Sequence, residues 1–391
     1  MISPYSTAGT NSHGRPRILI FSQRGLGIER WRCCGLEFED VVRGIDDVEM
    51  VAPSPSKTSD ARLRVMRGVS RHVPQVRAIG SGLAVTPEYD RYDMLFAEAG
   101  YMGELLALAP LKKWRKKCAL TVCYVEEIFV SYLDRLKGQL ELLKEFDLIF
   151  CACAGTVDEL SERLGREVTY LPPGVDALRF RPTLEPDERA IEVAMLGRRS
   201  VETHQALIEH AAATGAFYFH DGTWWAPKLW VTEPSQHRIL LANILKNARF
   251  FIANRANFDR RDKIRTQEEI GFRFFEGAAA GAVLLGDHPR TEEFQTLFGW
   301  DESVIPIPAD CPKVGDIVRD LNTQPERLRR ISRHNVKNSL LRHDWVYRWR
   351  TILDAAGLPP TEMTTLRTEQ LARLSADIDV DIGAKQKLVA V

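Results

Sequence analysis

Short apolar runs alternate with helical patterns along most of the chain. Runs that are apolar throughout, without a polar face, are typical of strands buried in parallel sheets. In the first half they predict strands at Arg17–Ser22, Val48–Ala52, Asp93–Ala97, Leu120–Val125 and Asp147–Ala152. In the second half they predict strands at Glu192–Leu196, Phe217–His220, Phe250–Ala253 and Val283–Gly286. The pattern therefore predicts an α/β protein whose parallel sheets are covered by helices.

The helical patterns between these strands complete the predicted layout. Helices are expected up to Ile45 and at Glu126–Glu145, Glu202–Thr214, Glu326–Leu340 and Trp345–Ala356. A segment rich in proline and glycine, Leu171–Pro182, breaks the alternation near the middle of the chain. After about Pro359 we expect one more amphipathic stretch and an end of low information. The predicted parts are Rossmann-like domains at 1–172 and 173–344, a helix at 345–360 and a tail at 361–391.

Composition narrows the classes of function. The 391 residues suit two domains of ordinary size, and 53 basic residues balance 53 acidic ones. This balance argues against a nucleic-acid binder, which usually carries a basic face. Seven scattered cysteines indicate a reducing cytosol, where Cys33-Cys34 and Cys151-Ala-Cys153 are expected to be buried thiols. Without an apolar leader or spanning segment, we expect a cytoplasmic protein with at most peripheral membrane contact.

The most informative stretch runs from Glu268 to Asp287 and reads E-E-I-G-F-R-F-F-E-G-A-A-A-G-A-V-L-L-G-D. Two carboxylates, Glu268 and Glu276, flank the start of a predicted helix. Carboxylates accept hydrogen bonds from hydroxyl groups, and a helix N-terminus attracts phosphate. Gly271 lets a phosphate approach the backbone closely. One loop and helix could therefore hold the sugar, the diphosphate and the ribose of a sugar nucleotide.

This stretch resembles the E-x7-E signature of retaining GT-B glycosyltransferases, including the glycine at the fourth position and E-x-x-A-x-G in the helix. Arg273 in R-x-F-E, followed by G-A-A-A-G-A-V-L-L, is most similar to the spore-coat glycosyltransferase-like branch. Two further segments resemble the same enzymes. They are P-x-G-V-D-x-x-x-F-x-P, with Gly174, Val175, Asp176, Phe180 and Pro182, and the closing segment Asp344-Trp345…Trp349-Arg350.

The resemblance implies a GT-B fold, in which two Rossmann-like domains face a central cleft and the last helix crosses back to the first domain. It implies a hexosyltransferase that moves a sugar from a nucleotide sugar to a glycan, glycolipid or small-molecule acceptor, as in polysaccharide biosynthesis. Retention is expected. Neither a cofactor nor a metal is expected, because cations and helix dipoles stabilise the leaving diphosphate. The D-x-D pattern at Asp377–Asp381 lies in the tail, where a metal site for the donor is not expected.

The resemblance also implies roles for residues. Glu268 would hold donor-sugar hydroxyls, Glu276 the ribose, and Arg198 or Arg199 the phosphates. The catalytic candidates are Glu268, Arg198, Glu126 and Glu127. The donor-binding candidates are Gly197, Arg198, Arg199, Arg265, Glu268, Gly271, Phe272, Arg273 and Glu276, and the acceptor-side candidates are Gly25 and Gly27. Alanine should suit the helix at 276 and leave the fold intact.

The chain departs from the family at one phosphate-binding position. Related enzymes have a lysine about five residues after the glycine-arginine turn, where this chain has Thr203 and His204. The missing cation could be replaced by Lys263, Arg265 or Arg273.

Other readings remain. Gly25-Leu26-Gly27 after the first strand invites a dinucleotide site, but position 30 is arginine and no acidic residue follows the second strand. Neither a P-loop nor G-x-S-x-G nor H-E-x-x-H occurs. A sugar-nucleotide epimerase on the same fold, or a catalytically silent module that binds nucleotide or glycan, stays open beside the transferase.

Overall fold

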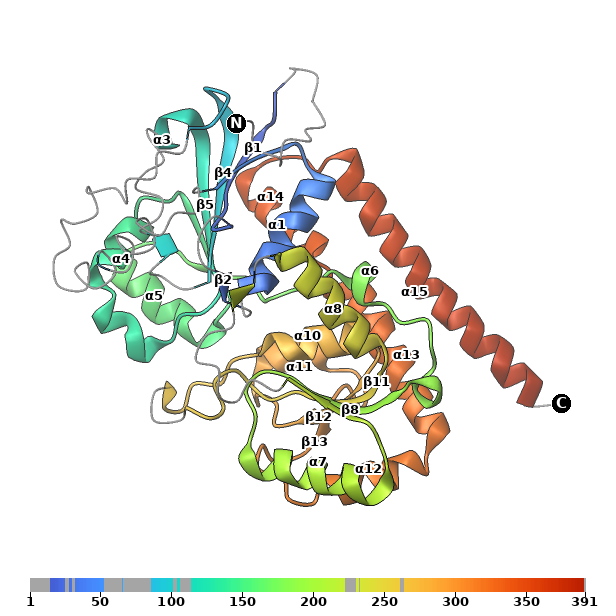
Figure 1. The fold of residues 1–391 in the computed structure, drawn as a ribbon. Helices are drawn as coiled ribbons and strands as arrows, with labels where there is room; N and C mark the ends of the chain where they lie inside the picture. The colour runs from blue at the N-terminus through green and yellow to red at the C-terminus, as the bar shows by residue number, and fades with distance from the viewer. Residues whose placement is uncertain are drawn as a thin grey trace. The chain divides into compact units, whose positions relative to one another are not determined.

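The computed structural model describes residues 15–24, 28–29, 32–52, 65, 86–100, 104–105, 114–221, 230–231, 233–260 and 264–389. By their contacts they form two compact units (Figure 1). The first unit comprises Met1–Pro173, Trp230–Ser235 and Arg348–Thr365; the second comprises Gly174–Leu229, Gln236–Tyr347 and Leu366–Val391. The first break, between Pro173 and Gly174, lies beside the boundary that the sequence predicts at 172/173.

A six-stranded parallel sheet forms the centre of the first unit, in the order β3-β1-β4-β5-β6-β7. Its strands are β1 Ile18–Phe21, β3 Val48–Val51, β4 Tyr92–Ala99, β5 Cys118–Val125, β6 Leu148–Cys151 and β7 Thr169–Tyr170. A short antiparallel ribbon pairs β2 (Ile28–Glu29) with β10 (Trp230–Val231). The central strands are almost wholly buried, as the apolar runs predict for a sheet with two covered faces.

The helices of the first unit are α1 Cys33–Ile45, α3 Trp114–Lys117, α4 Lys137–Leu143 and α5 Val157–Leu164, with a short 3₁₀ helix at Ala154–Thr156. The single helix predicted at Glu126–Glu145 is wrong. The structure has a 3₁₀ helix at Val130–Arg135 and then α4. Leu136, between the two, has φ −111° and ψ 17°, which lies outside the α-helical region and separates them.

A late segment of the chain completes the core of the first unit. Helix α14 spans Trp345–Ala356, and its residues from Arg348 onward belong to this unit. The Trp349 ring packs edge-on against Phe38 and Phe96, with centroids 6.3 and 5.5 Å away, and its Nε1 donates to Asp46 at 2.7 Å. Part of the first unit's core therefore comes from residues more than 170 positions beyond its own sheet, as the residue numbers show.

The second unit contains a five-stranded parallel sheet in the order β13-β12-β11-β8-β9. Its strands are β8 Ile191–Met195, β9 Tyr218–His220, β11 Ala248–Ile252, β12 Val283–Gly286 and β13 Ile305–Pro306. Its helices are α6 Ala177–Phe180, α7 Val201–Thr214, α8 Pro234–Lys246, α10 Phe272–Ala279, α11 Glu292–Phe298, α12 Val314–Asn322 and α13 Pro325–Arg342, with a 3₁₀ helix at Pro186–Glu188. Figure 1 shows α7 and α12 on one face of the sheet, and α10 and α11 on the other.

The two sheets confirm the predicted α/β fold with two Rossmann-like domains. The P-x-G-V-D segment and the closing segment, far apart in sequence, pair within the second unit. The Val175 N–H donates to the His343 carbonyl at 2.9 Å. A Cβ on Gly174 would lie 2.7 Å from the Trp345 ring, so only glycine fits beneath that ring.

The tail is more ordered than the sequence suggests. Helix α15 runs over Glu362–Val389 without a break, where one amphipathic stretch and a low-information end were expected. Arg367 on this helix forms ion pairs of 2.7 Å with both Asp176 and Asp344. The beginning of α15 is thereby attached to the paired segments of the second unit.

Candidate functional site

Each sheet has one place where the strand order reverses. In the first unit β1 lies between β3 and β4, and in the second β8 lies between β9 and β11. The connections leave such a pair of strands in opposite directions and open a crevice at their carboxyl ends, where α/β proteins bind ligands. A ligand is therefore expected near β1 and β4 in the first unit and near β8 and β11 in the second.

The turn after β8 is held by one carboxylate. Gly197 has φ +82°, a left-handed conformation that glycine adopts without strain, and its N–H donates to both Asp221 oxygens at 3.2 Å. Arg199 is buried and pairs with Asp221 at 2.6 Å. Arg198 is 39% exposed and pairs with Asp259 at 3.2 Å. Arg199 therefore stabilises the turn, while Arg198 lies at its surface.

Where related enzymes have a phosphate-binding lysine, this chain has Thr203 and His204. Both residues have hydrogen-bonding partners within the protein. Thr203 donates to the Ala309 carbonyl at 2.6 Å and accepts from the Cys311 N–H at 2.8 Å. The Nδ1 atom of His204 lies 2.7 Å from the Tyr218 hydroxyl. Burial and the nearby positive charge of Arg199 lower the pKa of His204. In this structure, Thr203 and His204 thus have partners other than a phosphate.

Helix α10 begins at the carboxyl end of the same sheet. Gly271 is its N-cap, and a Cβ there would lie 3.0 Å from the carbonyl oxygen of Asn254, which follows β11. Phe272 and Arg273 form the first helical turn and are half-buried. The N–H groups of a first turn have no acceptor within the helix, so this end is electrostatically suited to an anion.

Glu276 lies one turn further along α10 and is fully buried. Its Oε1 accepts from Nη1 of Arg238 on α8, and its Oε2 accepts from Nη1 of Arg273. Burial alone would raise the pKa of Glu276, but the charges of Arg273 and Arg238 outweigh it and hold the pKa at about 2. The structure argues against the expectation that alanine leaves the fold intact here, because the substitution would remove a buried carboxylate that pairs with the buried Arg238.

Glu268 lies in the loop before α10 and connects two neighbouring loops. It forms an ion pair with Arg255, which follows β11, and its Oε2 accepts from the Arg290 N–H at 2.9 Å. Its side chain is 27% exposed. An ionised carboxylate offers about four acceptor positions, so Glu268 can still accept from a hydroxyl group. Arg265, in the same loop, is exposed and has φ +56°.

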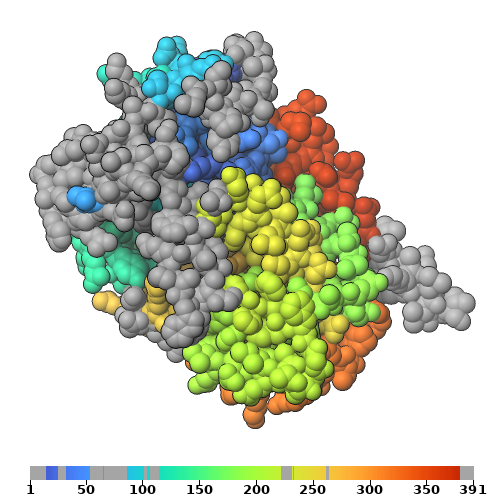
Figure 2. Space-filling view, viewed as in Figure 1, coloured from blue at the N-terminus to red at the C-terminus, as the bar shows by residue number. Residues whose placement is uncertain are grey.

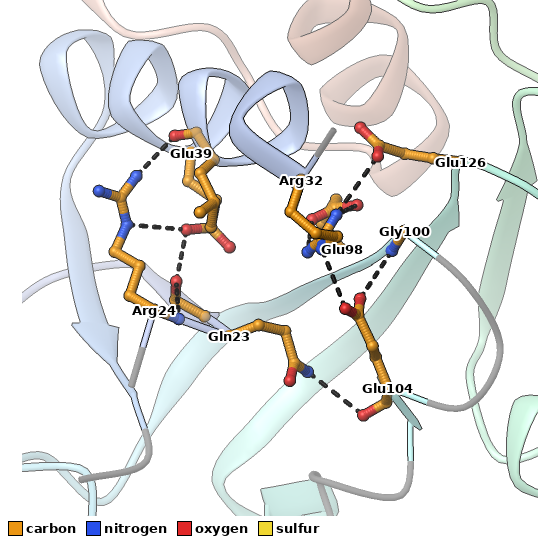
Figure 3. A network of polar contacts seen from close by, with 10 residues as sticks. Gln23, Arg24, Arg32, Glu39, Glu98, Gly100, Glu104 and Glu126 are labelled. Atoms are coloured by element: carbon orange, nitrogen blue, oxygen red, sulfur yellow. Dashed lines mark hydrogen bonds and ion pairs between the residues drawn. The ribbon is translucent and has the colours of Figure 1, made fainter. Parts of the chain in front are cut away.

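A different network of charged residues lies at the carboxyl ends of the strands in the first unit (Figure 3). Arg32, immediately before α1, is buried and pairs with Glu98 through two contacts of 2.6 and 2.7 Å. Its Nε lies 3.0 Å from Glu104, and its Nη1 lies 3.3 Å from Glu126. One guanidinium group is therefore shared by three buried carboxyl groups.

Two carboxyl groups of this region hold protons more tightly than usual. Burial, reinforced by the charge of Glu98, raises the pKa of Glu126 well above its usual value. Burial also raises the pKa of Glu39 to about 7, although Arg24 lies 3.2 Å away and lowers it. Among the described residues, nothing donates to Oε1 of Glu126 or of Glu39. The structure thus places Glu126 inside a buried network.

The backbone of α1 makes room for this network. A Cβ on Gly35, in the first turn of α1, would lie 2.6 Å from Cδ of Glu98 and 2.7 Å from Oε1 of Glu126. Carboxyl groups of the protein therefore lie against the helix N-terminus where a phosphate lies in many nucleotide-binding sheets. The remaining candidates differ: Glu127 is exposed, and Gly25 and Gly27 lie outside the described residues.

The sequence analysis does not identify several residues of these sites, among them Arg32, Arg238 and Asp221. Helix α8 lies at the surface of the second unit (Figure 2, yellow), and its Ile239 and Leu240 are exposed. Arg238, next to them, is only 1% exposed. A basic residue on a surface helix normally faces solvent, so no signal in the sequence marks it.

Among the described residues, no group of three or more histidine, cysteine, aspartate or glutamate side chains could hold a metal ion. In the same part of the chain, no helix combines the length and apolar character needed to cross a membrane.

Comparison with known proteins gives one family and a set of similar folds. Residues 198–354, most of the second unit, match a family model described as glycosyl transferase-like. None of the curated proteins matches the sequence significantly. A solved α-glucosyltransferase in complex with UDP is 13% identical, with 88% of this chain and 100% of that chain covered at a TM-score of 0.53.

A second structure, an α-glucosyltransferase with UDP-glucose and DNA containing an abasic site, gives the same identity and coverages (13%, 88% and 100%) at a TM-score of 0.51. At this level of identity the likeness shows the fold. The fold is the GT-B fold with two Rossmann-like domains that the sequence motifs predict.

Proposed function

We propose that the protein is a glycosyltransferase that moves a hexose from a nucleoside diphosphate sugar to a hydroxyl group of an acceptor. The proposal rests on the groups that meet at the carboxyl ends of β8 and β11. There the N-terminus of α10 and the guanidinium group of Arg273 lie beside the Gly197 turn. The family match, over residues 198–354, includes α10 and Arg273. UDP-glucose is the proposed donor, by analogy with the structural neighbours.

Most candidates of the second unit have a proposed task here. Arg198, Arg265 and the first turn of α10, with Gly197, Gly271 and Phe272, face the diphosphate. Arg199 holds the Gly197 turn in place through Asp221, and Glu268 accepts hydrogen bonds from the hexose hydroxyls. As the bond between the sugar and the diphosphate breaks, negative charge develops on the leaving phosphate. Fixed cations and backbone N–H groups stabilise that charge without reorganisation. Transfer is therefore expected to proceed in a chelator.

We assign the acceptor to the first unit, with Gly25, Gly27, Glu126 and Glu127 on its side. We propose a glycan, glycolipid or small-molecule acceptor and retention of configuration at the anomeric carbon. The formal net charge of +0 does not favour a DNA acceptor.

A thermal-shift panel with the diphosphates of uridine, guanosine and adenosine tests the proposal first. A ligand at 100 times its dissociation constant stabilises the native state by about 2.7 kcal/mol. Arg198→Ala should weaken the shift, whereas Arg319→Ala, which removes an exposed arginine of α12, should not. Absence of a shift with all three diphosphates would contradict the proposal.

Product analysis with UDP-[¹⁴C]glucose, an acceptor panel and a chelator tests the reaction itself. Transfer to an acceptor supports the proposal. Release of an epimer or a glycal without an acceptor identifies an epimerase. Tight binding without any product identifies a silent binding module. Activity that a chelator abolishes and only a divalent ion restores would contradict the proposed role of the arginines.

A further inference from the structure

An uninterrupted line of contacts connects the P-x-G-V-D-x-x-x-F segment to the Gly197 turn. The Phe180 ring lies 5.0 Å from the guanidinium carbon of Arg238. Arg238 donates to one oxygen of Glu276, and Arg273 donates to the other. Nη2 and Nε of Arg273 lie 3.4 and 3.9 Å from the Cβ position of Gly197. All five residues belong to the second unit.

Burial along this line falls toward the sheet edge. Glu276 and the Arg238 side chain are 0% and 1% exposed, whereas the Arg273 side chain is 32% exposed. Together, Glu276, Arg238 and Arg273 carry a formal charge of +1. Glu276 and Arg238 are buried, so the part of this charge that solvent can reach is the guanidinium group of Arg273. The network therefore keeps a cation in place before any ligand arrives.

Glu276 is poorly placed to bind a ribose itself. Both of its oxygens are engaged by arginines, and none of its surface is exposed. A ribose hydroxyl could reach the remaining acceptor positions of this carboxylate only if the side chains around it moved, and that would disturb a buried charge network.

Arg273 belongs to α10, which lies on the opposite face of the sheet from α7 (Figure 1), and α7 carries the position where related enzymes have a phosphate-binding lysine. Thr203 and His204 are engaged with Ala309, Cys311 and Tyr218. A guanidinium fork binds phosphate oxygens through two N–H groups. We propose that Glu276 is a positioning residue, which acts on the donor's diphosphate through Arg273 and does not contact the ribose. The inference rests on the proposed function and gives Glu276 a role different from the one expected from its motif.

Calorimetric titration with two probes, UDP and uridine, tests the proposal, because both contain the ribose and only one contains the diphosphate. Arg273→Met and Glu276→Gln should each lower the affinity for UDP about ten- to a hundredfold and leave the affinity for uridine within about twofold. The double variant should be no worse than Arg273→Met alone, since both changes remove one interaction. Glu192→Gln is the matched control: Glu192 pairs with His210 at 2.8 Å near the start of β8.

The outcomes are distinct. Equal losses for UDP and uridine in Glu276→Gln would mean that Glu276 binds the ribose, and additive losses in the double variant would mean that it acts independently of Arg273. Either result overturns the proposal. Should Glu276→Gln not fold, Glu276→Asp keeps the charge but withdraws it from Arg273, with the same expectations. A wild-type protein that binds none of the nucleoside diphosphates contradicts the proposed function, whereas tight UDP binding unaffected by Arg273→Met contradicts this inference alone.

Discussion

The reversal points of the two sheets carry opposite charge arrangements. At β1 and β4 of the first unit, one arginine, Arg32, is surrounded by the carboxyl groups of Glu98, Glu104 and Glu126. In the second unit, beside β8, one carboxylate, Glu276, is held between Arg238 and Arg273. The strand order around the two places is the same, β3-β1-β4 in one unit and β9-β8-β11 in the other. The helices differ: the carboxyl groups lie at α1, which precedes β3, whereas Glu276 lies on α10, between β11 and β12.

This contrast has a chemical meaning for each unit. Excess carboxyl groups at the N-terminus of α1 repel a phosphate and favour groups that donate hydrogen bonds, such as hydroxyls. Excess guanidinium groups near the N-terminus of α10 favour a diphosphate. The contrast also argues against a dinucleotide site at the N-terminus of α1, because protein carboxyl groups lie where such a ligand's phosphate would be expected.

The largest effect is expected when Arg32 is removed from its network with Glu98, Glu104 and Glu126. Arg32→Met should destabilise the first unit by about 3–5 kcal/mol, because three buried carboxyl groups lose their shared partner. Hydrogen exchange of the β1 and β4 amides measures this loss locally. Protection unchanged from the wild type would show that the network is not a stabilising feature of this unit.

A pH dependence of opposite sign in the two networks comes next. In the folded state Glu39 has a pKa of about 7 against an ordinary value of 4.5, so the folded state holds the proton more tightly. Its contribution is fully present below pH 4.5 and is lost as the pH rises to about 7, on the order of 3 kcal/mol. For Glu276, with a pKa of about 2, stability is instead lost as the pH falls from 4.5 to 2.

Glu39→Gln is the variant that isolates the first of these effects. Arg24, Arg32, Ser22 and Glu98 face this carboxyl group and remain unchanged in the variant. Hydrogen exchange of α1, corrected for intrinsic rates, should show a decline in stability between pH 5 and 7 in the wild type that the variant lacks. Parallel profiles in the two proteins would show that Glu39 does not retain its proton.

A smaller effect compares two glycines of the same helix. In Gly35→Ala the new methyl group would collide with Glu98 and Glu126, at a cost of about 1–3 kcal/mol. Gly44→Ala is the matched control, since nothing lies within 4 Å of its Cβ position, and it should stabilise α1 by about 0.5–1 kcal/mol. Thermal unfolding of both variants decides the matter, and equal shifts would mean that the carboxyl groups move aside freely.

The smallest effect is expected for Arg198, which lies at the surface of the second unit. The Arg198–Asp259 pair is 39% and 38% exposed, so Arg198→Ala should change stability by less than about 0.5 kcal/mol. Denaturation by urea measures this change. A loss as large as that of Arg32→Met would show that Arg198 is a structural residue and would weaken its assignment to the donor.

The sequence predicts the strands well because they are marked locally. The strand Val283–Gly286 has the predicted bounds, since a fully apolar run between an alanine-rich helix and Asp287 leaves little choice. The helix predicted at Glu126–Glu145 fails because an amphipathic period does not show where the backbone leaves the helical region, as it does at Leu136.

The sites are less visible than the strands because their residues meet across long distances in sequence. Arg32 and Glu126 are 94 residues apart, and Arg238 and Glu276 are 38 apart. No local pattern couples the members of such a pair. The motif around Glu268 and Glu276 identifies the helix, but the partners that decide the state of each carboxylate are set by the folded structure.

The place of Trp349 in the first unit has a consequence for synthesis of the protein on the ribosome. The chain emerges from its N-terminus, yet the core around Phe38 and Phe96 needs a side chain that is translated almost 200 residues after β6, as the numbering shows. The Thr361 hydroxyl that donates to the Ile45 carbonyl comes later still. Domains usually fold in the order in which they emerge. Here the unit that is made first is completed only after the strands of the second unit have been translated, so a nascent chain arrested at residue 173 would present an unfinished core to chaperones.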